Sequence, residues 1–128
     1  LVLHESNAIL RYLCHKHGLT DWYPAEPAHR ARVEQWLDWN QCRLSPAVID
    51  IVLNKVFLGE KGDKDAIRRG AAKLRELTPI LDAGLAGHDF LAGPMPTIAD
   101  LSVASNLFQL DLADAHRRGA QIAHWIGA

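Results

Sequence analysis

Glu5 and Ser6 are the residues whose types and spacing point most directly to chemistry. They end a short apolar run and precede a stretch, residues 8–13, whose apolar side chains have the spacing of an amphipathic helix. Ser6 can cap this helix, where free backbone N–H groups and the positive end of the helix dipole favour a carboxylate or phosphate. Glu5 beside it could hold an ammonium group. The pair therefore predicts a site for a ligand that carries a carboxylate and an amine on one carbon.

Thr97 and Asp100 form a second motif, which predicts a helix start. Thr97 can accept a hydrogen bond from the amide of Asp100, while the carboxylate of Asp100 accepts one from the amide of Thr97. This arrangement is a capping box in which aspartate replaces the usual glutamate. We interpret both residues as structural, because the helix that follows is apolar enough to be buried and its first amides need partners.

The remaining reactive side chains form no pattern that predicts catalysis or metal binding. His15 and His17 are two residues apart, so a helix would point them to different faces. Cys14 and Cys42 have neither metal-ligand spacing nor the density of a disulfide framework, which favours reduced thiols in a cytoplasmic protein. We therefore assign no catalytic residue and no metal site to this chain.

Charge and hydropathy argue against two classes of partner. The chain has 14 basic and 15 acidic residues among 128, and the basic ones are scattered, so the sequence predicts no nucleic-acid partner. Apolar residues make up 48% of the chain, yet their longest stretches are far too short to cross a bilayer, so no membrane partner is expected either.

The elements that must position these residues are helices, and the sequence predicts an all-α fold. Residues 21–27 contain two prolines around an acidic residue, which is typical of an extended linker. We expect the apolar face of the last strong helix to be Ile98, Leu101, Ala104, Ser105, Phe108 and Leu112. The apolar periodicity predicts helices over residues 8–17, 28–58, 65–87 and 98–112, and in a final segment that contains Ile122, Trp125 and Ile126.

The helix expected over residues 28–58 has an interrupted apolar stripe. Asn40 and Gln41 stand where the next apolar pair should be, and Pro46 removes a backbone donor, so a kink is expected. Two interpretations remain open at this point. The polar pair is either the exposed side of a long core helix or a patch that faces a ligand.

Two segments in this order, separated by predicted helices, together resemble the glutathione S-transferase family, and the resemblance extends over nearly the whole chain. The first is residues 3–13, with the Glu5-Ser6 pair, and the second is the Leu-Ala-Gly to Thr-Ile-Ala-Asp arrangement over residues 91–100. Residues 22–24, 31–34, 39 and 56–60 are most similar to the theta class. The resemblance implies a transferase that uses glutathione as co-substrate in detoxification, with Glu5 and Ser6 as contacts of the γ-glutamyl group. It also implies an electrophilic small-molecule substrate and a homodimer in the intact protein.

The resemblance further implies a domain plan. Residues 1–20 would be the last strand and helix of a thioredoxin-like α/β domain, residues 21–27 the linker, and residues 28–128 the family's all-helical C-terminal bundle. We expect the chain to be a fragment, because it begins without methionine and its apolar helical spacing continues almost to Ala128. The residue that activates the thiol would then lie in the part not included, and the fragment alone would be inactive.

Two other hypotheses remain open from the sequence. Transferase-like helical domains also serve as non-catalytic interaction modules in elongation-factor and synthetase complexes, and the helical motifs alone do not separate the two. The chain could also be an unrelated helical bundle in which Ser6 is only a cap. The Glu5-Ser6 pair favours the ligand-binding hypothesis.

Overall fold

The computed structural model describes residues 1–112, and all regular structure in this part of the chain is helical. The predicted all-α class is confirmed. Residues 1–4 form no regular element, and the segment around Ile122, Trp125 and Ile126 lies outside the described residues. The elements are α1 (Ser6–His17), α2 (Pro27–Trp39), the π-helical turn η1 (Asn40–Leu44), α3 (Ser45–Val52), the π-helical turn η2 (Leu53–Phe57), the short η3 (Gly59–Lys61), α4 (Lys64–Leu85) and α5 (Ile98–Leu112).

The helix expected over residues 28–58 is one continuous rod with two wide turns. The kink was expected at Pro46, but the irregular turn is η1, which ends at Leu44, directly before α3 and two residues before Pro46. The amide of Ser45 bonds to the carbonyl of Asn40, one residue further back than in an α-helix. Because Pro46 has no N–H and its ring crowds the preceding turn, the wider turn accommodates it without breaking the rod.

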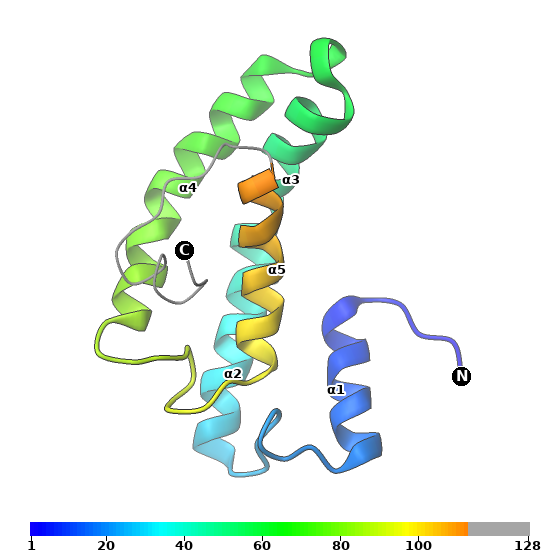
Figure 1. The fold of residues 1–128 in the computed structure, drawn as a ribbon, viewed down its shortest axis with the longest axis vertical. Coiled ribbons are helices and arrows are strands. Elements are labelled where there is room, and N and C mark those ends of the chain that lie inside the picture. Colours follow the sequence, from blue (N-terminus) through cyan, green and yellow to red (C-terminus); the bar gives the residue numbers. More distant parts are fainter. Residues whose placement is uncertain (113–128) are drawn as a thin grey trace.

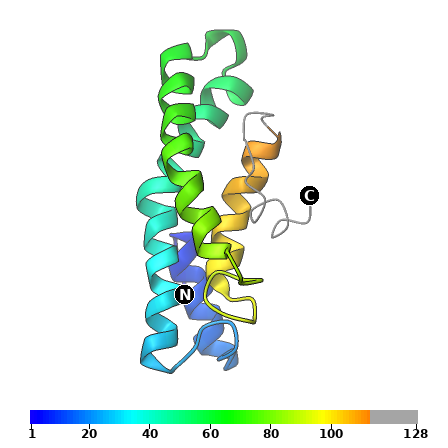
Figure 2. The same ribbon diagram turned by 90° about the vertical axis from the view of Figure 1, so that its left-hand side faces the viewer.

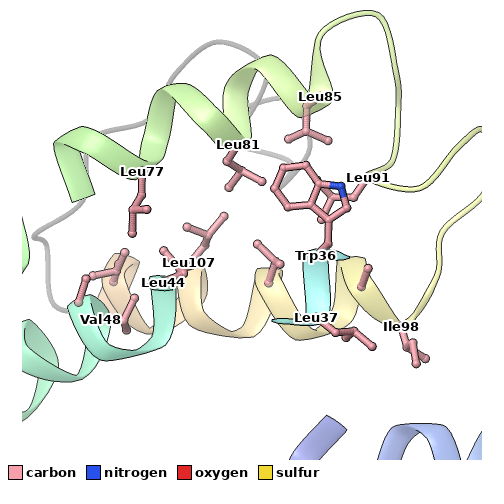
Figure 3. Close-up of a cluster of buried hydrophobic side chains, with 14 of the residues drawn as sticks. Trp36, Leu37, Leu44, Val48, Leu77, Leu81, Leu85, Leu91, Ile98 and Leu107 are labelled. Carbon is pink, nitrogen blue, oxygen red and sulfur yellow. The ribbon is translucent and has the colours of Figure 1, made fainter. Parts of the chain in front are cut away.

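Helix α4 runs antiparallel to this rod, and α5 packs along α2 and α3 of the rod (Figures 1 and 2). Helix α1 stands on the side of α5 away from α4 (Figure 1). The core fills the space between α4, α5 and the rod, where leucines of α4 point toward Trp36, Leu44 and Leu107 (Figure 3). The apolar spacing predicted for α4 is therefore confirmed, since Leu74, Leu77, Leu81 and Leu85 are all buried.

The face expected for α5 is wrong in part. Ile98 is buried as expected, but Leu101 and Phe108 are exposed by 49% and 64%. The other buried apolar side chains of α5 are Ala99, Val103, Leu107 and Leu110. Because α5 is apolar nearly all round, its periodicity could not distinguish the face packed on the rod from the face turned away from it.

Candidate functional site

The chain direction changes sharply at Glu5, immediately before α1. Glu5 has φ 72° and ψ 110°, and it is the one non-glycine residue with positive φ in the described part of the chain. This region of backbone space is sterically costly for a residue with a Cβ. Such strain is found mostly where function or packing demands it. Both Glu5 and Ser6 are exposed to solvent.

Ser6 is the first residue of α1 and not its cap, which corrects the sequence prediction. The cap position belongs to Glu5, whose carbonyl accepts the amide of Ile9 at 3.0 Å and whose side chain makes no capping bond. The Ser6 hydroxyl therefore remains unbonded within residues 1–112. The amides of the first turn also lack partners within the helix, so the end of α1 still offers donors to an anion.

A groove of about 560 Å³ adjoins Ser6 and is bounded by α1, η1 and α5. Its lining is uncharged and consists of short hydroxyl and amide side chains with a few apolar ones. Asn40 and Gln41 both line this groove; Asn40 is buried and Gln41 is exposed. The polar pair that interrupts the apolar stripe thus faces the groove. The lining includes Ser6, Ile9, Asn40, Gln41, Ser45 and Gln109.

A chain of polar side chains connects α1 to this region, and the sequence analysis missed most of it. The hydroxyl of Ser102 donates to Oδ1 of Asn7 at 2.8 Å and accepts from Nδ2 of Asn40 at 3.0 Å. Nδ2 of Asn106 donates to Oδ1 of Asn40 at 2.8 Å. The sequence held one usable signal. Ser102 and Asn106 are four residues apart, and so share a face, on a helix that is otherwise apolar.

A second polar contact joins α1 to α2 at the next turn of α1. Arg11 donates to both carboxylate oxygens of Glu34, at 3.1 and 2.9 Å, and the hydroxyl of Tyr23 donates to the same carboxylate at 2.7 Å. The hydrogen bonds from Arg11 lower the pKa of Glu34 despite partial burial, and the bond from Tyr23 adds to this effect. Burial and the neighbouring Glu34 raise the pKa of Tyr23. This cluster was not predicted, because its members are 11 and 23 residues apart in sequence.

The predicted capping motif is present with altered bonds. The carboxylate of Asp100 accepts the amide of Thr97 at 2.9 Å, as expected. The hydroxyl of Thr97, however, accepts the amide of Ala99 at 3.2 Å and not that of Asp100. The other carboxylate oxygen of Asp100 accepts the amide of Leu91 at 2.9 Å, which ties the preceding loop to the start of α5.

The remaining reactive groups lie apart from this region. Cys14 is buried, which raises the pKa of its thiol, and Cys42 is an exposed free thiol. Within residues 1–112 no three histidine, cysteine or acidic side chains come together as metal ligands. The same residues form no helix long and apolar enough to cross a bilayer.

Comparison with known proteins identifies the family. The model of the glutathione S-transferase C-terminal domain matches residues 64–128. Glutathione S-transferase GstB of Escherichia coli K12 is 34% identical in an alignment of 125 residues that covers 94% of this chain and 60% of that protein. Glutathione S-transferase theta-1 of Mus musculus is 37% identical in an alignment of 109 residues that covers 80% of this chain and 45% of that protein. The chain thus spans 60% or less of these relatives.

Solved structures agree with the sequence relatives. The theta class glutathione S-transferase of Xanthomonas axonopodis pv. citri, crystallised with glutathione bound, has a TM-score of 0.87 and 28% identity, covering 99% of this chain and 67% of that one. Human glutathione S-transferase T1-1 in its apo form has a TM-score of 0.87 and 29% identity, covering 99% and 56%. The helical architecture, the match to the domain model and these neighbours agree, and the chain belongs to the glutathione S-transferase family.

Proposed function

We infer that this protein is a glutathione transferase that adds the glutathione thiolate to electrophilic small molecules. The observation that carries the inference is the start of α1, where Ser6 has a free hydroxyl beside unpaired amides and Glu5 adds a carboxylate. A neighbour of the same fold was crystallised with glutathione bound, which supports glutathione as the co-substrate. The same proposal includes an electrophilic small molecule as the second substrate, a homodimer as the intact protein and a location in the cytoplasm.

The chemistry assigned to this chain is binding and orientation. The Ser6 hydroxyl and the free amides of α1 would donate to the α-carboxylate of the γ-glutamyl group. The carboxylate of Glu5 would accept hydrogen bonds from the ammonium on the same carbon. Nucleophilic attack needs the thiolate, and no residue of this chain is assigned to lowering the pKa of the glutathione thiol.

The domain plan belongs to the proposal as well. Residues 1–20 would contribute the γ-glutamyl anchor as the end of a thioredoxin-like domain, and residues 21–27 would connect it to the helical domain of residues 28–128. In this plan the rod and α5 form one wall of the electrophile site. The uncharged lining of the groove suits a small molecule without a formal charge.

The test is an assay of the complete gene product, including any residues encoded before Leu1. With glutathione and a panel of alkyl halides and activated aryl halides, we expect thiol consumption above the uncatalysed rate. Residues 1–128 alone, verified as helical by circular dichroism, should give none. A complete product without turnover or glutathione binding would overturn the proposal and favour a non-catalytic interaction module.

A further inference from the structure

Few apolar contacts attach α1 to the rest of the described molecule. Cys14 is its one buried side chain, Leu10 packs partly against the core, and Ile9, Tyr12 and Leu13 are each more than a third exposed. Helix α1 also stands at the side of the bundle (Figure 1). Polar contacts must therefore fix much of its position, and two connect it to the bundle: Asn7 to Ser102 and Arg11 to Glu34.

These two contacts hold different turns of α1. Arg11 lies four residues, about 6 Å along the helix axis, beyond Asn7. Asn7 directly follows Ser6 and belongs to the first turn of α1, whose amides have no partner within the helix. The Asn7 contact is therefore the one that sets the position of the first turn.

The partner of Asn7 is itself held in one orientation. The Ser102 hydroxyl uses its single proton toward Asn7 and accepts from Asn40, while Asn40 accepts in turn from Asn106. Asn40, Ser102 and Asn106 are 4%, 7% and 8% exposed, so water does not compete strongly for these bonds. The Ser102 hydroxyl has one proton, so it can only accept from Asn40 once it donates to Asn7. Each residue therefore donates to the next, from Asn106 through Asn40 and Ser102 to Asn7.

We propose that Ser102 and Asn40 are positioning residues for the γ-glutamyl anchor, acting through Asn7 to hold the first turn of α1 where it receives the ligand carboxylate. The proposal rests on the proposed function, because it concerns the same ligand. It adds a requirement that the ligand contacts alone do not contain. Residues of the helical domain that do not contact glutathione must hold the first turn of α1 in position. Asn40 can do so because the wide turn η1, which it begins, places its buried amide beside α5.

The test measures glutathione affinity in the complete gene product by calorimetry, together with urea unfolding. We expect Ser102→Ala and Asn7→Ala each to weaken binding three- to tenfold. The double variant should bind within twofold of Asn7→Ala alone, since both changes break the same bond. Ser102→Thr, which restores the hydroxyl, should bind within twofold of the parent.

Thr78→Val is the matched control. It also deletes a hydroxyl that bonds inside the fold, to the carbonyl of Leu74 in α4, and it lies outside the groove. This variant should lose stability while its affinity for glutathione stays unchanged. A purely structural role of Ser102 would give the same result for Ser102→Ala.

The outcomes separate the two proposals. If Ser6→Ala weakens binding and Ser102→Ala does not, the positioning role is wrong and the proposed function stands. The positioning role would also be wrong if the losses of glutathione affinity added up in the double variant, or if Ser102→Thr bound glutathione as weakly as Ser102→Ala. If the parent protein does not bind glutathione, both proposals fail. If Ser102→Ala does not fold, the affinity of Asn7→Ala for glutathione tests the positioning role. Asn7 is only half-buried at a helix end, so its substitution should leave the fold intact.

Discussion

At the scale of single residues, the Asp100 carboxylate holds two backbone amides in place where α5 begins. One oxygen accepts from Thr97 and the other from Leu91, each at 2.9 Å, and both bonds are buried. Without the carboxylate, two amides would lose their acceptor in a part of the structure that water does not reach. Asp100 thus serves folding, because it holds the loop and the start of α5 together.

We predict that Asp100→Ala lowers the free energy of unfolding by about 2–4 kcal/mol, because an unsatisfied buried amide costs on the order of 1–3 kcal/mol. Urea denaturation measures this directly. Asp65→Ala is the control, since its exposed pair with Arg68 should be worth less than about 1 kcal/mol. A change for Asp100→Ala no larger than that of the control would contradict the capping role.

Glu34 gives the fold a contribution that depends on pH. Its carboxylate receives both Arg11 and Tyr23, and the Arg11 bonds lower its pKa below the usual value. A carboxyl whose pKa is lower when folded stabilises the protein fully above its unfolded pKa of about 4.3. This stabilisation is lost as the pH falls through the folded pKa.

We therefore predict that Glu34→Gln reduces stability at pH 7, on the order of 1 kcal/mol for a partly exposed ion pair. The difference from the parent should shrink as the pH falls below about 4, where the parent carboxylate also becomes protonated. Urea midpoints at several pH values provide the measurement. Glu76→Gln, which breaks an exposed pair with Lys73, should change little at any pH. A Glu34→Gln difference that stays constant from pH 7 to pH 3 would refute the linkage.

At the scale of the elements, two glycines allow α4 to pack closely on the rod. A Cβ on Gly70 would lie 2.7 Å from the carbonyl oxygen of Ala47 and 2.8 Å from Cγ1 of Ile51. A Cβ on Gly84 would lie 2.4 Å from Cζ2 of Trp36. These contacts explain why two residues of low helix propensity stand inside a long helix.

We predict that Gly70→Ala destabilises the protein by about 1–3 kcal/mol, because the added methyl group overpacks the contact with α3. Helix propensity alone predicts the opposite sign, a gain of about 0.5–1 kcal/mol. Ala72→Gly, at an exposed position of the same helix, measures that propensity term in this protein. A Gly70→Ala variant more stable than the parent would show that α4 and α3 are not packed as described.

The sequence predicted the elements better than their contacts. The α4 stripe and the Thr97–Asp100 motif depend on residues near each other in the chain, and both are present. The bond between Asn40 and Ser102 joins residues 62 apart, which no local pattern reveals. The positive φ of Glu5 was not predicted, because glutamate rarely adopts it and nothing nearby signals a turn. The actual role of Ser6 as first helical residue follows from that turn.

At the scale of the whole molecule, α1 and α5 both expose large apolar side chains. Ile9, Tyr12 and Leu13 of α1 and Leu101 and Phe108 of α5 are exposed, and no other described element covers them. Exposed apolar side chains of this kind pack against a partner surface where one is present. Their exposure agrees with the proposal that residues 1–20 belong to a larger domain, whose remaining elements would pack here.

The central claim is that the start of α1 binds the γ-glutamyl group, and calorimetric titration of glutathione into the complete gene product tests it most directly. Charge-assisted hydrogen bonds are worth roughly 1.5–3 kcal/mol, so Ser6→Ala and Glu5→Gln should each weaken binding about tenfold or more. Both variants should unfold at the same urea concentration as the parent. Thr20→Ala, an exposed hydroxyl deletion beyond the other end of α1, should bind normally. Parent-like affinity in both site variants would mean that Glu5 and Ser6 only begin a helix, and would contradict the account.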